Sequence, residues 1–458
     1  MANRRHATKP GRSLQAAARL SPAASPVPFG DGAAVVTLAF VVVGSCLLVD
    51  PGAYASFDAP KRLVALGGAA VAAFAAFGLG QGGRGIAEAW REISSAARIA
   101  LLAFAFGLLW CGVAALASPH RSASLDTFRT IVLYSAFLPL GASRAAGRGK
   151  GLLVAALLAA TAVNAALSLA QSRGHSPFRL QTFGTRNETG ALAGNVGYLA
   201  LALALGAVLV LGLALSARSP ASRAAAVGAL LLFLAGLVVN RNLTALVSLA
   251  AGGVVLLSAR LGRRSILAIA AVVAALAGAA IFSAPLRQRI AEAAGMVRAG
   301  EWDRLTTYRT GAWAAALDMA RERPLVGWGP GTYAAEFVPH RLQAEIRAKR
   351  RYVNPLLTSS YSEAHCDYLQ AFAETGVPGG LAAIVALAAL VGALARRAAG
   401  PPGLTSERAV LLGILAAGAA AALTWFPMQR PISAVPLLLA AGRSWRIAAA
   451  NRKGPPLP

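Results

Sequence analysis

Apolar runs of about 20 residues recur along the chain, and charged or Gly/Pro-rich breaks separate them. A helix of roughly this length crosses the hydrocarbon core of a bilayer. The pattern therefore predicts an all-α polytopic membrane protein with about 12 transmembrane helices. The expected spans lie near residues 34–50, 62–80, 98–117, 128–142, 151–171, 190–216, 224–239, 242–259, 265–284, 379–395, 408–426 and 431–448.

The first, fourth and last predicted spans differ from the rest of this pattern. The run 128–142 is short, and Arg443 lies late in the last run. A basic stretch precedes the first run, as in a signal sequence, but nothing that resembles a cleavage site follows Asp50. We therefore favour an uncleaved first span. Residues 1–30 are basic and rich in Pro and Ala, and we expect a disordered cytoplasmic tail.

Composition excludes the other broad classes of protein. Hydrophobic residues make up 57% of the chain and charged residues only 14%, which is not the composition of a soluble, disordered or collagen-like protein. The chain has 44 Lys and Arg against 18 Asp and Glu, a net charge of +26. The basic residues are scattered between apolar runs. This placement is typical of loops on the cytoplasmic side of a membrane, so we expect no nucleic-acid partner.

The distribution of basic residues also predicts the orientation. If the N-terminus is cytoplasmic, 23 Lys and Arg residues fall in inside segments and nine in the short outside loops. This bias agrees with the positive-inside rule and places both termini in the cytoplasm. The predicted order is then spans one to nine within 31–284, an extracytoplasmic catalytic loop over 285–378, and spans ten to twelve with a cytoplasmic tail over 379–458.

The loop 285–378 interrupts the rhythm of apolar runs. It holds 10 of the 18 acidic residues and two of the five histidines. A loop of this length is usually functional or disordered, and its Trp, Tyr, Phe and Leu content indicates order. Apolar residues at helical spacing predict an amphipathic surface helix over 285–298.

A second helix is expected from about Tyr308 to Arg321, with Thr306 or Thr307 as its cap and Arg309 in its first turn. One face of this helix would carry Trp313, Leu317 and Ala320.

Two further helices are expected in the loop, after a Gly-rich turn over 323–331 whose glycines permit positive φ. One runs from about residue 333 to 351. The other covers 360–376, and Gly376 and Pro378 end it. His365 lies in its first predicted turn, where the positive end of the helix dipole favours a neutral imidazole.

Several motifs follow one another in a fixed order in the second half of the chain. They are Thr182 to Asn187, Arg241, Arg309 with Trp313, Arg323 to Tyr333, and Ala364 to Gln370 followed by Glu374 to Gly376. In this order, within an outward loop of a polytopic protein, they resemble the motifs of the O-antigen ligase/polymerase family of bacterial membrane glycosyltransferases. The resemblance covers roughly residues 180–380. Cys366 stands where this family usually has Asn.

The resemblance implies a function and a set of site residues. It implies transfer of a glycan from undecaprenyl diphosphate to an acceptor hydroxyl, on the lipid A core or a similar acceptor, at the outer face of the bacterial inner membrane. His365 matches the catalytic base. Arg309 and Arg241 match the motif arginines that would bind the diphosphate, with Arg309 also catalytic and Arg186 a weaker addition. Guanidinium groups suit this task because their planar donors pair with phosphate oxygens.

Simpler interpretations of these residues stay open. A lone loop histidine is more often a hydrogen-bonded surface residue than a catalyst. Arg241 would serve equally as an anchor at the membrane surface. Arg309 has acidic neighbours in Glu301 and Asp303, and Arg186 has one in Glu188, so each of these arginines has an ion-pair alternative.

Other chemistry finds little support in the sequence. No Asp-x-Asp pair, His-Glu-x-x-His motif or clustered Cys/His set occurs, and the cysteines Cys46, Cys111 and Cys366 form no readable framework, so no metal site is indicated. Residues 78–83 match Gly-x-Gly-x-x-Gly but end a membrane span, which rejects a dinucleotide fold. A carrier-linked sugar is already activated, so we expect no cofactor.

Related functions would use much the same residues. The leading hypothesis is a ligase, and a polysaccharide polymerase or a protein O-oligosaccharyltransferase is the alternative within the class. A small-anion transporter is the alternative from another class, but it should carry ionisable residues in the middle of its spans. Here charges collect at the ends of the spans and in the loop, which favours an enzyme.

Overall fold

All regular elements in the described part of the chain are helices. The computed structural model describes residues 28–53, 55–91, 93–176, 188–264, 266, 284–352, 361–395 and 402–449. In this part of the chain the all-α prediction is confirmed. The α-helices of the bundle are α1 (Phe29–Leu47), α2 (Ala59–Ala73), α3 (Gly82–Arg91), α4 (Ser95–Ala117), α5 (Arg121–Ser135), α6 (Phe137–Ala142), α7 (Arg144–Arg148), α8 (Lys150–Gln171), α9 (Val196–Ser216), α10 (Pro220–Asn240), α11 (Leu243–Leu261), α17 (Asp367–Ala395), α18 (Pro402–Ala422) and α19 (Pro431–Ala449). The loop contributes α13 (Ala284–Arg298), α14 (Trp302–Leu305), α15 (Thr310–Glu322) and α16 (Tyr333–Ala348), and short 3₁₀ or π elements are η1 (Phe74–Leu79), η3 (Ala191–Ala193), η4 (Gly262–Arg264) and η5 (Pro427–Gln429).

Eight helices of the described residues are long and apolar enough to cross a membrane. They are Phe29–Leu47, Ala59–Leu79, Ser95–Ala117, Lys150–Gln171, Val196–Ser216, Pro220–Asn240, Leu243–Leu261 and Asp367–Ala395. Each corresponds to a predicted span. The predicted ninth span, 265–284, lies almost wholly outside the described residues, as does the predicted tail before Pro28. The chain is thus a multi-pass helical membrane protein.

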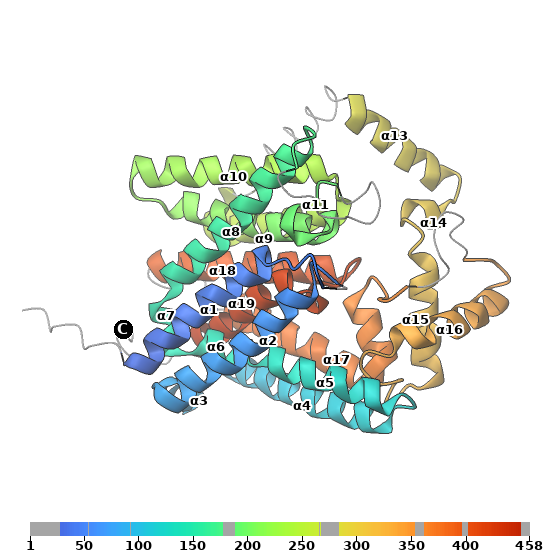
Figure 1. Ribbon diagram of the computed structural model, residues 1–458, viewed down its shortest axis with the longest axis horizontal. Coiled ribbons are helices and arrows are strands. Elements are labelled where there is room, and N and C mark those ends of the chain that lie inside the picture. The colour runs from blue at the N-terminus through green and yellow to red at the C-terminus, as the bar shows by residue number, and fades with distance from the viewer. Residues whose placement is uncertain are drawn as a thin grey trace, which may run out of the picture.

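The long helices run side by side, and the loop helices gather at one end of the bundle. Figure 1 shows α13 to α16 at this loop end, whereas α3 and α7 lie at the opposite end. Helix α4 packs on α17, α11 on α18, and α1 on α2. At the opposite end Asp31, near the start of α1, pairs with Arg148 of α7.

The predicted fourth span, 128–142, is divided in the structure. Pro139 has no backbone N–H, so it cannot bond to the carbonyl of Ser135 four residues earlier. Helix α5 ends at Ser135, and the Ala136 N–H instead donates to the Leu133 carbonyl at 3.2 Å. The chain resumes as the short helix α6. Since α5 begins at Arg121, the helical segment is also longer than the apolar run predicted.

Gly376 ends a helix, as predicted, but the chain turns there and continues directly into the next span. Gly376 has φ +69° and ψ −175° inside α17. A Cβ at this position would overlap the Leu325 carbonyl oxygen, so only glycine fits. The Val377 N–H donates to the Pro324 carbonyl at 2.7 Å. The Gly-rich turn is therefore attached to the break in α17.

The loop helices agree with the sequence in number more than in detail. Helices α13, α15 and α16 stand where three were predicted, and α14 is an addition. The predicted Thr cap is wrong, because Thr307 and Tyr308 have positive φ and Arg309 occupies the N-cap of α15. The predicted face is wrong as well, since Leu317 is exposed. The face that packs is small, and it comprises Gly311, Ala312, Ala315, Ala316 and Met319.

Candidate functional site

His365 lies just before α17 and not in its first turn, which corrects the predicted position. Its φ is +53°, a left-handed conformation that is uncommon for a residue with a side chain. The Trp313 indole N–H donates to the His365 carbonyl at 3.4 Å and links this residue to α15. Trp313 of the motif that begins at Arg309 and His365 of the motif that begins at Ala364 are thus in contact.

The imidazole of His365 has a defined tautomer. Its Nδ1 lies 3.0 Å from the backbone carbonyl of Glu363. A carbonyl oxygen only accepts, so Nδ1 carries the hydrogen in this bond. The lone pair of a neutral ring is then on Nε2, which is the arrangement a general base requires.

Aromatic rings surround this imidazole. It meets Tyr361, Trp425 and Phe426 edge to face, at centroid distances of 5.3, 5.4 and 5.0 Å. Trp425 and Phe426 stack on each other at 4.6 Å and form a shelf between α18 and η5. The Tyr361 hydroxyl donates to the Tyr308 carbonyl at 3.1 Å, which anchors the opposite wall.

This environment lowers the pKa of His365 from 6.5 to about 4. Burial among the rings is the main cause, because it disfavours the charged imidazolium. The positive charge of Arg309 is the second cause, and Arg430 adds to it, whereas the hydrogen bond to Glu363 acts in the opposite direction. The neutral form that the sequence predicted from a helix dipole is thus produced by burial and by neighbouring cations.

Arg309 also contacts the ring shelf. Its Nη1 donates to the Thr424 carbonyl at 3.0 Å, and its guanidinium lies 5.1 Å from the Trp425 ring centroid. The acidic neighbours proposed as alternatives have other partners, since Glu301 pairs with Arg304 and Asp303 with Arg350. Arg309 and His365 therefore contact the same indole ring, that of Trp425.

Arg430 is a member of the site that the sequence analysis did not single out. Its guanidinium pairs with Glu363 and, at 3.1 Å, with Asp58, and it lies over the rings of Tyr198 and Phe426. Only 13% of its side chain is exposed. The sequence showed only that an arginine precedes Pro431 in the short connection before the last predicted span. That position gave no indication of the residues with which Arg430 pairs.

Arg241 and Arg186 are the other two arginines that were predicted to bind the diphosphate. Arg241 is exposed, with φ +49°, at the C-cap of α10 on the loop end of the bundle. Close by, the hydroxyls of Thr244 and Thr424 lie 3.0 Å apart, so the start of α11 meets the segment that binds Arg309. Arg186 lies outside the described residues.

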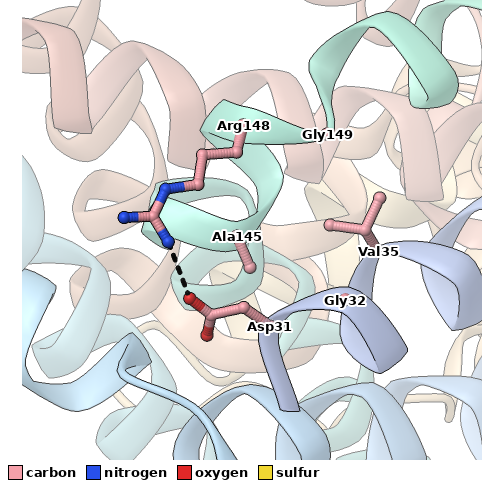
Figure 2. Close-up of a pocket in the computed structure, with 6 residues that line it drawn as sticks. All are labelled: Asp31, Gly32, Val35, Ala145, Arg148 and Gly149. Atoms are coloured by element: carbon pink, nitrogen blue, oxygen red, sulfur yellow. Dashed lines mark hydrogen bonds and ion pairs between the residues drawn. The ribbon is translucent and has the colours of Figure 1, made fainter. Parts of the chain in front are cut away.

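A cavity of about 190 Å³ lies far from these residues, at the opposite end of the bundle. Figure 2 shows its lining, with the pair of Asp31 and Arg148 on one side and Val35 and Gly149 on the other. Nη1 of Arg148 lies 3.3 Å from Oδ2 of Asp31, and the Asp31 side chain is buried. This cavity takes no part in the site at the loop end.

The geometry defines a class of protein: a multi-pass membrane protein with a neutral imidazole near two guanidinium groups at one end of its bundle. Residues 228–384 match the family model described as O-antigen ligase. In this part of the chain, the match confirms the resemblance to the O-antigen ligase family that was drawn from the motifs. The matched segment contains Arg241, Arg309 and His365. No curated protein matches the chain.

Proposed function

We propose that this protein transfers a glycan from an undecaprenyl-diphosphate carrier to a hydroxyl of the lipid A core or a similar acceptor. The family match supports an O-antigen ligase or polymerase type of membrane enzyme. In this proposal the protein lies in the bacterial inner membrane, with both termini in the cytoplasm and the loop in the periplasm. A polymerase or a protein O-oligosaccharyltransferase is the alternative within the class.

One observation carries the proposal. A histidine whose Nε2 carries the lone pair is held neutral near guanidinium groups, at the end of the bundle that carries the loop helices. A neutral base and fixed positive charge are the two things that this transfer requires, because a hydroxyl must lose a proton and a diphosphate must depart.

The proposed reaction is a single displacement. Nε2 of His365 removes the proton from the acceptor hydroxyl as its oxygen bonds to the anomeric carbon of the glycan. The bond between that carbon and the diphosphate oxygen breaks, and undecaprenyl diphosphate leaves with the electron pair. Arg309, with Arg241 and Arg186 as further contacts, stabilises the charge on the leaving diphosphate. The donor bond supplies the energy, so the proposed step needs no cofactor.

Arg430 has a different role in this proposal, because its guanidinium is already paired with the carboxylates of Glu363 and Asp58. It holds Glu363 in place, and the backbone carbonyl of Glu363 orients the imidazole. Arg430 is thus a positioning residue, and its guanidinium also helps keep His365 neutral.

The test is a glycan profile of cells in which wild type, His365→Ala or Arg309→Ala replaces a deletion. The glycans are resolved on gels and probed for carrier-linked polymer. If long glycan accumulates on the carrier while lipid A core stays bare, the protein is a ligase. Accumulation of single repeat units identifies a polymerase, and loss of glycosylated protein identifies an oligosaccharyltransferase.

Two exposed residues near the end of α8 provide controls, Arg173→Ala and His175→Ala, which should restore the wild-type profile. Membrane levels of all variants are compared by immunoblot. If His365→Ala and Arg309→Ala restore a wild-type profile at equal levels, the assigned chemistry is wrong, and transport becomes the better hypothesis.

A further inference from the structure

Helices α15 and α16 form a hairpin around the Gly-rich turn, and acidic residues and a histidine face one another across it. Asp318 and Glu322 are one turn apart on α15, and Glu336 and His340 are one turn apart on α16. This cluster, which we call the hairpin cluster, lies toward the end of α15 that is farther from Arg309. The rise of a helix places Asp318 about 14 Å along the axis from Arg309.

Three side chains of the hairpin cluster converge closely. Nδ1 of His340 lies 2.9 Å from an oxygen of Asp318 and 3.7 Å from an oxygen of Glu322. One ligand atom from each of the three residues lies within 4.8 Å of the other two. Asp318 and His340 are buried, and half of the Glu322 side chain is exposed, which opens one side of the cluster to solvent.

The second nitrogen of His340 also has an acidic neighbour. Nε2 lies 3.7 Å from one oxygen of Glu336, and the other oxygen of Glu336 lies 2.6 Å from Nε2 of His120, next to α5. The His340 ring packs edge to face on Trp328, with 4.8 Å between centroids. A histidine that binds a metal ion through one nitrogen commonly directs the other N–H toward a carboxylate, which fixes the ring.

The charges of the hairpin cluster do not balance. It contains three carboxylates, and the guanidinium that pairs with them in the described part of the chain is that of Arg347, 2.6 Å from Asp318. Arg323 lies nearby against the Trp328 ring, 4.3 Å from its centroid. Imidazoles aside, three carboxylates face one paired guanidinium, an excess of negative charge that a divalent cation would neutralise.

We propose that the hairpin cluster binds a divalent transition-metal ion of the zinc type, through Asp318, Glu322 and Nδ1 of His340. Tetrahedral zinc with bonds of about 2.0–2.2 Å places its ligand atoms roughly 3.3 Å apart, and the distances of 2.9 and 3.7 Å lie on either side of that value. The nitrogen ligand favours zinc over calcium or magnesium, which take oxygen ligands. A water molecule completes the coordination on the exposed side.

The role of this site is structural. It joins the end of α15 to the middle of α16, on either side of the turn that packs on Gly376. The ion lies away from the end of α15 that meets His365 and takes no part in glycan transfer, so the proposal does not depend on the function proposed above. The competing occupant is a proton, which would make His340 an imidazolium paired with Asp318.

The experiment uses the full chain in detergent, with any affinity tag removed, stripped by a chelator and dialysed against about 10 µM zinc chloride. A site of micromolar affinity is then mostly occupied, and binding to the folded state alone raises the unfolding temperature. Bound zinc is counted by elemental analysis, and thermal unfolding is followed with and without zinc. We expect one bound zinc ion per chain and a higher unfolding temperature with zinc.

Two variants test the ligands. Glu322→Gln, a change of a half-exposed side chain that keeps its shape, should weaken zinc binding at least tenfold, and His340→Ala should abolish it. His175→Ala is the matched control, because it removes an exposed imidazole outside the cluster and should leave one zinc ion bound.

If the wild type binds no zinc, the cluster is held by a proton and the proposal is wrong. It is equally wrong if zinc binds but neither cluster variant changes the affinity. Should His340→Ala fail to fold, Glu322→Gln alone decides between these results.

Discussion

The charge of Arg309 acts on the pKa of His365, and this effect can be measured directly. With a pKa of about 4, about 99% of the imidazole is neutral at pH 6, whereas with an ordinary pKa of 6.5 only about 24% would be neutral. Burial is the largest cause and Arg309 the second. Replacing Arg309 by Gln should therefore raise the pKa part of the way, to a value between about 4 and 6.5.

Nuclear magnetic resonance of histidine-labelled protein in nanodiscs gives the pKa without relying on turnover. The chain has five histidines, and the signal that His365→Ala removes identifies the residue. The wild-type signal should change near pH 4. In Arg309→Gln the midpoint should move to higher pH, and in Arg309→Lys, which keeps the positive charge, it should stay close to the wild-type value.

The sign of the effect also predicts a stability change. The folded protein binds a proton at His365 only near pH 4, whereas the unfolded chain binds it below about 6.5, so this group destabilises the folded state as pH falls through that interval. A wild-type midpoint near 6.5 would refute the burial argument. An unchanged midpoint in Arg309→Gln would refute the role of the guanidinium.

Other predictions concern the surroundings of the site. Gly327→Ala should lower the free energy of unfolding by about 1–3 kcal/mol, measured by thermal unfolding in detergent, because its φ is +66° and a Cβ would overlap the backbone of Glu374. Arg430→Met should cost about 3 kcal/mol in the same assay and abolish glycan transfer, because it leaves the largely buried Glu363 without its cation, whereas Asp58 keeps Arg62. Lys61→Met should cost about 1–3 kcal/mol and increase hydrogen exchange nearby, because the buried ammonium donates to three backbone carbonyls at 2.7–2.8 Å.

Matched changes elsewhere in the chain serve as controls for these variants. Gly295→Ala on α13 meets no atom within 4 Å and should be neutral or stabilising. Arg129→Met breaks an ion pair that is exposed on both sides and should change stability by less than about 1 kcal/mol. If Gly327→Ala or Arg430→Met proves as mild as its control, the close packing inferred around the site is wrong.

The sequence predicted the elements of the fold well where one local rule decides them. Apolar length predicted the eight helices that are long and apolar enough to cross a membrane, and Gly376 predicted the end of a helix because glycine readily adopts a positive φ. The small packing face of α15, in contrast, depends on long-range contacts. Ala312 and Met319 are buried against other parts of the loop, and no spacing rule distinguishes that face from the one with Leu317.

The candidate site was predicted in part for the same reason. Motif order brought out His365 and Arg309, and the structure places both against Trp425. Arg430 was missed because its importance lies in partners 67 and 372 residues away in sequence. The neutral state of His365 was expected from a helix dipole, but that residue precedes the helix, and aromatic rings from the connection between α18 and α19 exclude water instead.

The connection between α18 and α19 has a consequence for building chimeric enzymes. Thr424, Trp425 and Phe426 hold Arg309 and His365 from outside the loop, and Arg430 reaches Glu363 from the same short stretch. A graft that exchanges only residues 285–378 with a relative would bring a foreign imidazole and guanidinium onto the Trp425 and Phe426 rings of this chain. If the proposed function is correct, the preference for the glycan donor should pass to the chimera only when residues 424–430 are exchanged together with the loop. The two segments would then have to be exchanged as one unit.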